Sequence, residues 1–176
     1  MIYPFSAFIL LQLQEALGYF IIGCLHDAFD NDNSSKKKSV RKMLIQVFNA
    51  GSSSIKFALY QHQSKLKLLK GNLEKIGEAS SILSFQTSSS PSQKIELPSG
   101  CQNHKEGIQK IIEIFDQEKN NSGSADLIVH RVVHGGTKYR HAALLDQEVK
   151  QFIRDMIPLA RTHHPASLAC IEEISE

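Results

Sequence analysis

From Met43 onward the sequence has a series of short β-type segments, and this pattern constrains the fold more than any other feature. The first two segments, residues 44–48 and 55–60, are rich in β-branched and aromatic residues and are joined by a stretch of turn-forming residues, 49–54. Further strands are predicted over 66–73, 82–87, 93–97 and 127–133. The cluster Ser88–Ser92 is expected to form the turn between the second and third of these.

Helical signals appear only after the strand predicted over 93–97. Apolar residues at helical spacing predict an amphipathic helix over 107–119. Asp146 is predicted to cap a second helix that runs to Met156, and Pro165 is predicted to begin a third. Strands followed by alternating helices and strands indicate an α/β or α+β domain over residues 43–176.

Residues 1–42 have a different composition, with an apolar stretch followed by a polar and then a basic one. Only Glu15 is charged within 1–25, whereas 34–42 carries five basic residues and no acid. A membrane-spanning helix is one interpretation of this pattern. Polar residues inside the stretch, and a positive charge that follows it, argue against an anchor and against a secretory signal. We therefore expect a leader that is dispensable for folding, either real or from a mis-started reading frame, and a cytoplasmic protein.

Overall charge and cysteine content exclude several classes of function. The chain has 20 basic and 18 acidic residues, which is too balanced for an electrostatic binder of nucleic acid. Its three cysteines lie far apart and lack CxxC spacing. They argue against a disulfide framework and a zinc finger, and they fit a reducing compartment.

The turn over 49–54 has the residues of a phosphate-binding loop. Gly51 permits a positive φ and close approach of the backbone, and successive N–H groups in such a turn can bind phosphate oxygens. Asn49 could position water or a hydrated metal, and Lys56 could face a phosphate. A polar hairpin turn with an exposed lysine explains the same residues, and a Walker A sequence is absent.

A second motif, residues 130–136, places Arg131 inside an apolar strand. A guanidinium in such a position needs an anionic partner, which can be a bound carboxylate, a phosphate or a structural ion pair. Gly135 and Gly136 end the strand and would let a ligand approach the backbone. His130 and His134 lack the helical spacing of a metal pair, so we expect them to be hydrogen-bonded and partly buried.

A third motif places His163 and His164 directly before a helix N-terminus. Such a terminus favours negative ligands, so a histidine there could donate to phosphoryl oxygens. Loop histidines without a role are the alternative.

Together these three motifs resemble the acetate kinase family. Residues 47–56, 130–136 and 163–168 match its opening strand–loop–strand, its most recognisable internal motif and its His-Asn-Pro segment, in that order. The resemblance implies the N-terminal domain of a ribonuclease-H-like, actin-like α/β fold with a mixed sheet and flanking helices. It covers 43–176 and leaves 1–42 without a counterpart. The implied reaction is reversible phosphoryl transfer from ATP to acetate, which gives ADP and acetyl phosphate.

The resemblance also implies roles for residues on the phosphate side of the site. Asn49 is similar to the family residue associated with Mg²⁺, and Lys56 is similar to the one assigned to ATP. Ser52 and Ser54 fall on the loop near the phosphates.

On the acyl side, Arg131 resembles the arginine that holds the substrate carboxylate. Val133 matches a wall of the pocket for the acetate methyl group. His163 resembles a histidine that contacts the transferring phosphoryl group. Full-length members are expected to be homodimers.

Two departures from the family pattern bear on function. Thr162 stands where the family usually has leucine, which leaves propionate open as an alternative substrate, and His164 replaces an asparagine. The family's catalytic aspartate would lie beyond Glu176. We therefore expect a fragment that is inactive alone, with a non-catalytic remnant of an interrupted gene and a membrane-tethered protein as the other hypotheses.

Overall fold

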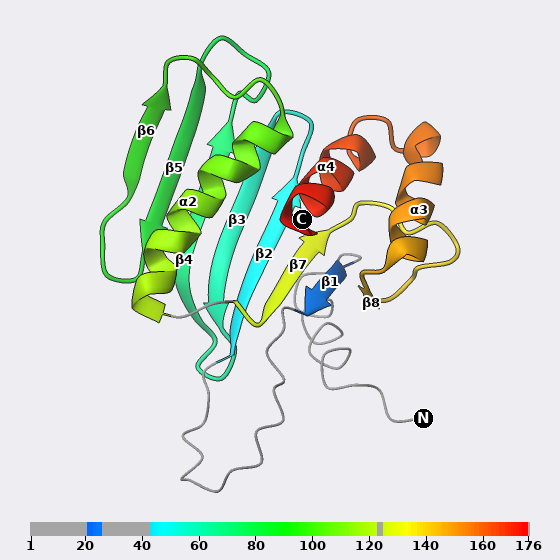
Figure 1. Cartoon of the computed structure of the whole chain (residues 1–176), viewed down its shortest axis with the longest axis horizontal. Coiled ribbons are helices and arrows are strands. Elements are labelled where there is room, and N and C mark those ends of the chain that lie inside the picture. The colour runs from blue at the N-terminus through cyan, green and yellow to red at the C-terminus, as the bar shows by residue number, and fades with distance from the viewer. Residues whose placement is uncertain (1–20, 26–42, 123–124, 176) are drawn as a thin grey trace, which may run out of the picture.

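A computed structural model describes residues 21–25, 43–122 and 125–175, and eight of their segments form one mixed sheet. The strand order is β6-β5-β4-β3-β2-β7-β1-β8 (Figure 1). Neighbouring strands from β2 to β6 are antiparallel, whereas β2 and β7 are parallel. The strands are β1 Ile21–Leu25, β2 Leu44–Ala50, β3 Ser54–Gln61, β4 Leu66–Glu74, β5 Ser81–Thr87, β6 Gln93–Leu97, β7 Leu127–Arg131 and β8 Ala143–Leu144.

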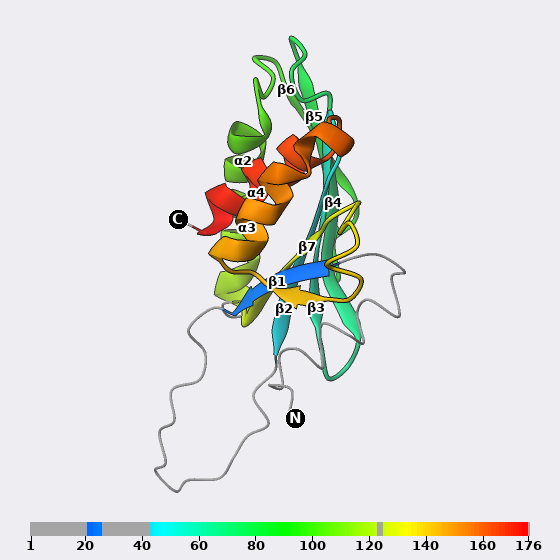
Figure 2. The ribbon, with the colours of Figure 1, turned by 90° about the vertical axis from the view of Figure 1, so that its right-hand side faces the viewer.

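Three α-helices lie on one side of this sheet, as Figure 2 shows edge-on. They are α2 His104–Ser122, α3 Gln147–Asp155 and α4 His164–Ser175, and the short 3₁₀ helix η1 Ile157–Leu159 follows α3. Helix α2 contacts β3, β4 and α4, and α4 contacts β2 and β7. The parallel strands β2 and β7 therefore run under the last helix, with their carboxyl ends at the same edge of the sheet.

The main core fills the space between the sheet and the helices. The ring of Phe115 on α2 packs edge-on against Phe48 and Phe57, with centroid distances of 5.5 and 5.6 Å. All three side chains are at most 3% exposed. Because successive residues of a strand face opposite sides, the neighbours of Phe48 and Phe57 point to the other face of the sheet. A smaller cluster of Ile45, Leu127 and Val129 lies on that face.

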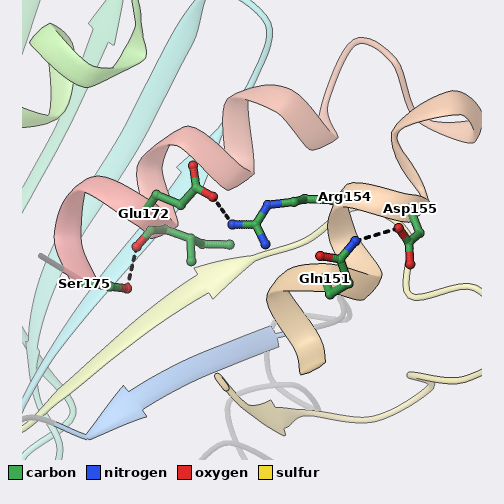
Figure 3. A network of polar contacts seen from close by, with 6 residues as sticks. Gln151, Arg154, Asp155, Glu172 and Ser175 are labelled. Atoms are coloured by element: carbon green, nitrogen blue, oxygen red, sulfur yellow. Dashed lines mark hydrogen bonds and ion pairs between the residues drawn. The ribbon is translucent and has the colours of Figure 1, made fainter. Parts of the chain in front are cut away.

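Helix α3 begins where the sequence predicts it. Asp146 is extended, and its Oδ1 accepts a hydrogen bond of 2.8 Å from the N–H of Val149, which confirms the expected N-cap. Figure 3 shows how α3 meets α4, through an ion pair between Arg154 and Glu172. On α3 itself, the Gln151 amide donates to Asp155 over 2.8 Å.

We expect Asp146→Ala to lower the free energy of unfolding by about 1 kcal/mol, since the Val149 N–H would lose its acceptor. Chemical denaturation monitored by circular dichroism measures this loss. Asp155→Ala is the matched control, because among the described residues that exposed carboxylate accepts from Gln151 alone, and a loss below about 0.5 kcal/mol is expected. Equal losses in the two variants would contradict the cap assignment.

Most elements predicted from the sequence are present, with boundaries shifted by a few residues. The helix predicted over 107–119 extends to 104–122, and the strand predicted over 127–133 ends at Arg131. The strands β1 and β8 were not predicted. Among the described residues, no helix is long and apolar enough to cross a membrane. The membrane-helix interpretation concerns residues that, apart from β1, lie outside the described ranges.

Candidate functional site

Two of the predicted site residues meet at the carboxyl ends of the parallel strands β2 and β7. The Arg131 Nη1 donates a hydrogen bond of 3.1 Å to the Asn49 Oδ1. Both side chains are half-buried. Residues 45–48 pair in register with 127–130, so Asn49 and Arg131 follow that ladder directly and share the face away from the helices. A guanidinium presents paired N–H donors in a planar fork, which suits Arg131 to a carboxylate or phosphate ligand.

Directly before this pair, on the helix-facing side, Phe48 and His130 stack on each other. Their ring centroids lie 5.5 Å apart at an interplanar angle of 18°. His130 is 2% exposed, and its Nε2 has no hydrogen-bond partner among the described residues. Burial, and to a lesser extent the charge of Lys150, lowers the pKa of His130 to about 3. The expectation of a partly buried, hydrogen-bonded histidine is therefore wrong for His130, because its ring packs as an apolar group.

This burial predicts a pH dependence of stability. Because the folded-state pKa lies below the usual 6.5, the unfolded chain binds the extra proton between about pH 6.5 and 3. The contribution of His130 is fully present above pH 6.5 and is lost as the pH falls, at up to about 1.4 kcal/mol per pH unit. We expect His130→Phe to reduce the slope of unfolding free energy against pH between 6 and 4.5. Parallel curves for His130→Phe and the natural chain would contradict this.

The turn between β2 and β3 is closed by its own backbone. The Gly51 N–H donates to the Ser54 carbonyl over 2.8 Å, and the Gly51 carbonyl accepts from the Nε2 of His104 over 2.7 Å. Gly51 is absent from the glycines with a positive φ. Gly51 therefore does not use the positive φ that a glycine permits. A Cβ there would lie 3.3 Å from the Ser54 Oγ, so a side chain at this position would be crowded by Ser54.

His104 is a supporting residue that sequence reasoning missed. It is the first residue of α2, and its ring fixes the turn that carries Ser52 and Ser54. A histidine at a helix N-terminus was visible in the sequence, but its contact spans 53 residues. No local pattern indicates a contact over that separation.

Ser52 lines a hollow of about 490 Å³ between the turn and the first residues of α2 and α4. Arg161 and Thr162 line its other side, directly before His163 in the chain. The structure therefore brings the first and third motifs, the turn over 49–54 and the segment before α4, to one edge of the sheet. Arg161 is a further candidate that sequence reasoning did not single out.

The side chain of Lys56 lines a different hollow from that of Ser52. It stands directly opposite Asn49 in the β2–β3 ladder, so both side chains share the face away from the helices. It is exposed and lines a second hollow of about 420 Å³ over β3, β4 and β5, together with Lys67 and Lys70. Lys56 and Ser52 thus lie near the same edge but line separate hollows.

The space beside the two glycines that follow β7 is filled by other residues of the chain. A Cβ on Gly135 would lie 2.0 Å from the Tyr139 carbonyl oxygen, and one on Gly136 would lie 3.0 Å from the ring of Phe152. The chain's own backbone and side chains therefore fill the space that a side chain would need at these two positions, which explains the glycines. Approach of a ligand to this backbone stays a prediction. Val133, by contrast, is 41% exposed at the end of β7 and is free to contact a small apolar group.

The two histidines before α4 have different environments. His164 is fully buried, and its Nδ1 donates to the Ile153 carbonyl over 3.2 Å, which ties α4 to α3. His163 is half-buried. Its backbone N–H donates to the Ala160 carbonyl over 3.1 Å, so the turn before α4 is ordered by main-chain contacts. Of the pair, only His163 is placed to meet a ligand.

Among the described residues, no group of three or more His, Cys, Asp or Glu side chains is placed to hold a metal ion. The side-chain oxygens in and beside the turn after β2 include the Asn49 amide and the hydroxyls of Ser52, Ser53 and Ser54. The Asn49 Oδ1 already accepts from Arg131 and keeps one lone pair. This donor set fits contact through water to a Mg²⁺ ion held by phosphate oxygens, and it does not form a direct protein cage.

A mixed sheet with flanking helices, and polar groups gathered at the ends of β2 and β7, define an α/β domain of the actin-like type. Residues 44–176 match the model of the acetokinase family, and the chain belongs to this family.

Individual relatives agree with this assignment. An acetate kinase of Borrelia garinii is 34% identical over 137 residues, covering 75% of this chain and 33% of that protein. One of Sulfurimonas denitrificans is 38% identical over 128 residues, covering 72% and 32%. The chain therefore spans about a third of the length of the curated relatives it matches.

Solved structures agree with the fold. The crystal structure of Porphyromonas gingivalis acetate kinase matches with a TM-score of 0.64 and 28% identity, over 75% of this chain and 34% of that one. A propionate kinase from Francisella tularensis matches with the same TM-score and identity, over 74% and 33%. The expected family and the expected N-terminal domain of an actin-like fold are confirmed.

Proposed function

We propose that residues 43–176 form the substrate-side wall of an acetate kinase, which transfers a phosphoryl group reversibly from ATP to acetate. The observation that carries this proposal is the hydrogen bond between Arg131 and Asn49. It joins two of the three sequence motifs at the carboxyl ends of parallel strands, where ligands of open α/β sheets bind.

In this proposal Arg131 holds the acetate carboxylate. A guanidinium matches a carboxylate through two parallel hydrogen bonds, and the half-buried position strengthens them by limiting access of water. Val133, two residues further and exposed, contacts the methyl group. Each carboxylate oxygen keeps a lone pair outside this pairing, and one of these lone pairs attacks the terminal phosphorus of ATP while the bond from that phosphorus to the bridging oxygen breaks and ADP leaves.

The remaining assignments concern the phosphoryl group and the nucleotide. His163 donates to the transferring phosphoryl oxygens from the segment before α4. Ser52 and Ser54 lie near the phosphates, and Lys56 contacts ATP from β3. Asn49 would hold Mg²⁺ through water, and the ion would supply charge neutralisation to the phosphates. Such reactions depend on positioning and on cationic donors rather than on covalent chemistry by the protein.

We further propose a cytoplasmic location, because ATP and acetate are soluble and the three cysteines fit a reducing compartment. Homodimer formation by full-length relatives stays a prediction.

We expect the chain alone to form no measurable acetyl phosphate from ATP and acetate. It spans about a third of its relatives, so proximity and preorganised charges from the rest of the site are missing. A hydroxamate assay on the chain alone, and then mixed with the remaining two thirds of a curated relative, tests this. Turnover only in the mixture supports the proposal, and turnover by the chain alone at a rate near that of a full-length relative contradicts it.

Propionate is a second candidate substrate. Thr162 lines the hollow beside Ser52. The resemblance of the segment before α4 to the family implies a leucine at this position, so a threonine here leaves the acyl preference open. The propionate kinase of Francisella tularensis is as similar in structure as the acetate kinase reported above. Running the same assay with both acids compares their kcat/KM values and decides between them.

A further inference from the structure

The hollow of about 420 Å³ over β3, β4 and β5 is basic. Lys56, Lys67 and Lys70 line it, and no Asp or Glu is among the described residues that do. Glu74, further along β4 on the same face, stands opposite Ser54 and lies outside the hollow. Within the described part of the chain, none of the three lysines forms an ion pair. Like charges gathered around one hollow repel each other, and a bound anion relieves this repulsion.

An irregularity in β4 brings the third lysine to this face. Lys67 and Lys70 are an odd number of residues apart, so a regular strand would point them to opposite faces of the sheet. The β3–β4 register shifts between Leu59 and Tyr60, so that Lys67 stands opposite Tyr60 while Lys70 stands opposite Ala58. The Lys67 Nζ accordingly lies 5.4 Å from the centroid of the Tyr60 ring. Bulges re-aim side chains in this way and are over-represented beside functional sites.

Neutral polar side chains complete the lining. Asn72 stands opposite Lys56 on one side and Ser84 on the other, and Gln86 stands opposite Lys70. All of them line the hollow. The Asn72 Oδ1 is buried and has no hydrogen-bond partner among the described residues. Because a buried acceptor without a donor costs free energy, this atom calls for a ligand that donates from a hydroxyl group.

We propose that this hollow binds a small organic phosphate that carries two phosphate groups and free hydroxyl groups, as a sugar bisphosphate does. Lys67 and Lys70 bind the phosphate oxygens as point charges, and the Asn72 Oδ1 accepts from a hydroxyl of the ligand. A volume of about 420 Å³ lies in the range of small-molecule sites. This site goes beyond the proposed function, and it stands whether or not Arg131 binds acetate. Its residues all lie within 44–176, the part of the chain that matches the family.

Isothermal titration calorimetry of the full chain with ribulose 1,5-bisphosphate tests the proposal, and we expect saturable binding. Replacing Lys67 and Lys70 together by glutamine is expected to weaken this binding at least about tenfold, since two cations that face the phosphates are lost. Lys110→Gln is the control, because that lysine is exposed on α2, outside this hollow, where it pairs with Glu113. A change of less than about twofold is expected there.

Asn72→Val separates hydroxyl recognition from attraction between charges. It removes the unpartnered oxygen and leaves a residue that suits a strand. We expect its affinity for ribulose 1,5-bisphosphate to fall about threefold or more, because one hydrogen bond is lost. The affinity for tripolyphosphate, which has phosphate oxygens but no sugar hydroxyls, is expected to change less than about twofold. Circular dichroism checks that each variant folds.

The outcomes that overturn the proposal are distinct. They are no saturable binding of ribulose 1,5-bisphosphate, equal weakening in Lys110→Gln and in the double lysine variant, or equal changes for the two probes in Asn72→Val. Binding that is lost in Arg131→Ala but kept in the double lysine variant would place the phosphates in the candidate active site, and this also overturns it. These measurements require no turnover, so a failure of the proposed kinase activity leaves their result unaffected.

Discussion

Replacing Arg131 by alanine is expected to lower kcat/KM for acetate by a factor on the order of 30 to 5,000. The protein to be assayed is a chimera, called the graft below, in which residues 44–176 of this chain replace the matching segment of the Borrelia garinii acetate kinase. The substrate carboxylate would lose its bidentate cation, and a desolvated contact of this kind is worth about 2–5 kcal/mol. The loss is expected in both KM and kcat, since the carboxylate would be held less firmly and less well aligned.

Two further variants of the graft make the result specific. Arg131→Lys keeps the charge but loses the planar fork, so an intermediate loss is expected. Arg154→Ala removes a guanidinium that pairs with Glu172 between α3 and α4, and activity within about twofold of the graft is expected. Unchanged KM and kcat in Arg131→Ala would refute its assignment to the substrate.

The largest expected effect on stability comes from Phe48. We expect Phe48→Ala to lower the free energy of unfolding by about 3–5 kcal/mol, because the ring is 1% exposed and contacts both Phe115 and His130. Urea unfolding monitored by circular dichroism measures it. Leu159→Ala, at a leucine that is 72% exposed, is the control and should change stability by less than about 0.5 kcal/mol. A loss below about 1 kcal/mol for Phe48→Ala would contradict its place at the centre of the core.

The Phe48 variant also bears on the site. Phe48 directly precedes Asn49, and its stacking partner His130 directly precedes Arg131. The aromatic stack on one face of the sheet thus supports the polar pair on the other. Perturbing the stack is expected to disturb the pair, although neither polar residue is changed.

Elements with strong local signals could be predicted from the sequence. Asp146 has the side chain of an N-cap directly before an amphipathic segment, and the structure confirms that cap. The strand over 93–97 has the predicted boundaries because turn-forming residues flank it. In both cases the information lies within a few residues of the element.

Features that depend on distant partners could not be predicted. The conformation of Gly51 is set by a carbonyl contact with His104, and the need for glycine at 135 comes from the Tyr139 backbone. The strand β1 gains its place from β7, more than a hundred residues later in the chain. Local composition showed an apolar stretch there, but it could not distinguish a sheet strand from a leader.

The candidate site was predicted in part, because its motifs are local but their arrangement is not. Asn49 and Arg131 were both named from the sequence, and the structure adds their contact over 82 residues. Lys56 lies on β3 and lines the hollow over β3, β4 and β5, whereas Ser52 lies in the turn before β3 and lines the hollow beside α2 and α4; this separation was not anticipated.

The rate of acetyl phosphate formation by the graft itself tests the central claim most directly. Residues 44–176 of this chain would supply the whole substrate-side wall, and the relative would supply the rest of the site. With ATP, Mg²⁺ and saturating acetate, we predict a hydroxamate signal well above that of the graft carrying Arg131→Ala. A graft that folds with a cooperative thermal transition like that of the parent enzyme, yet forms no acetyl phosphate, would contradict the claim that this domain serves an acetate kinase.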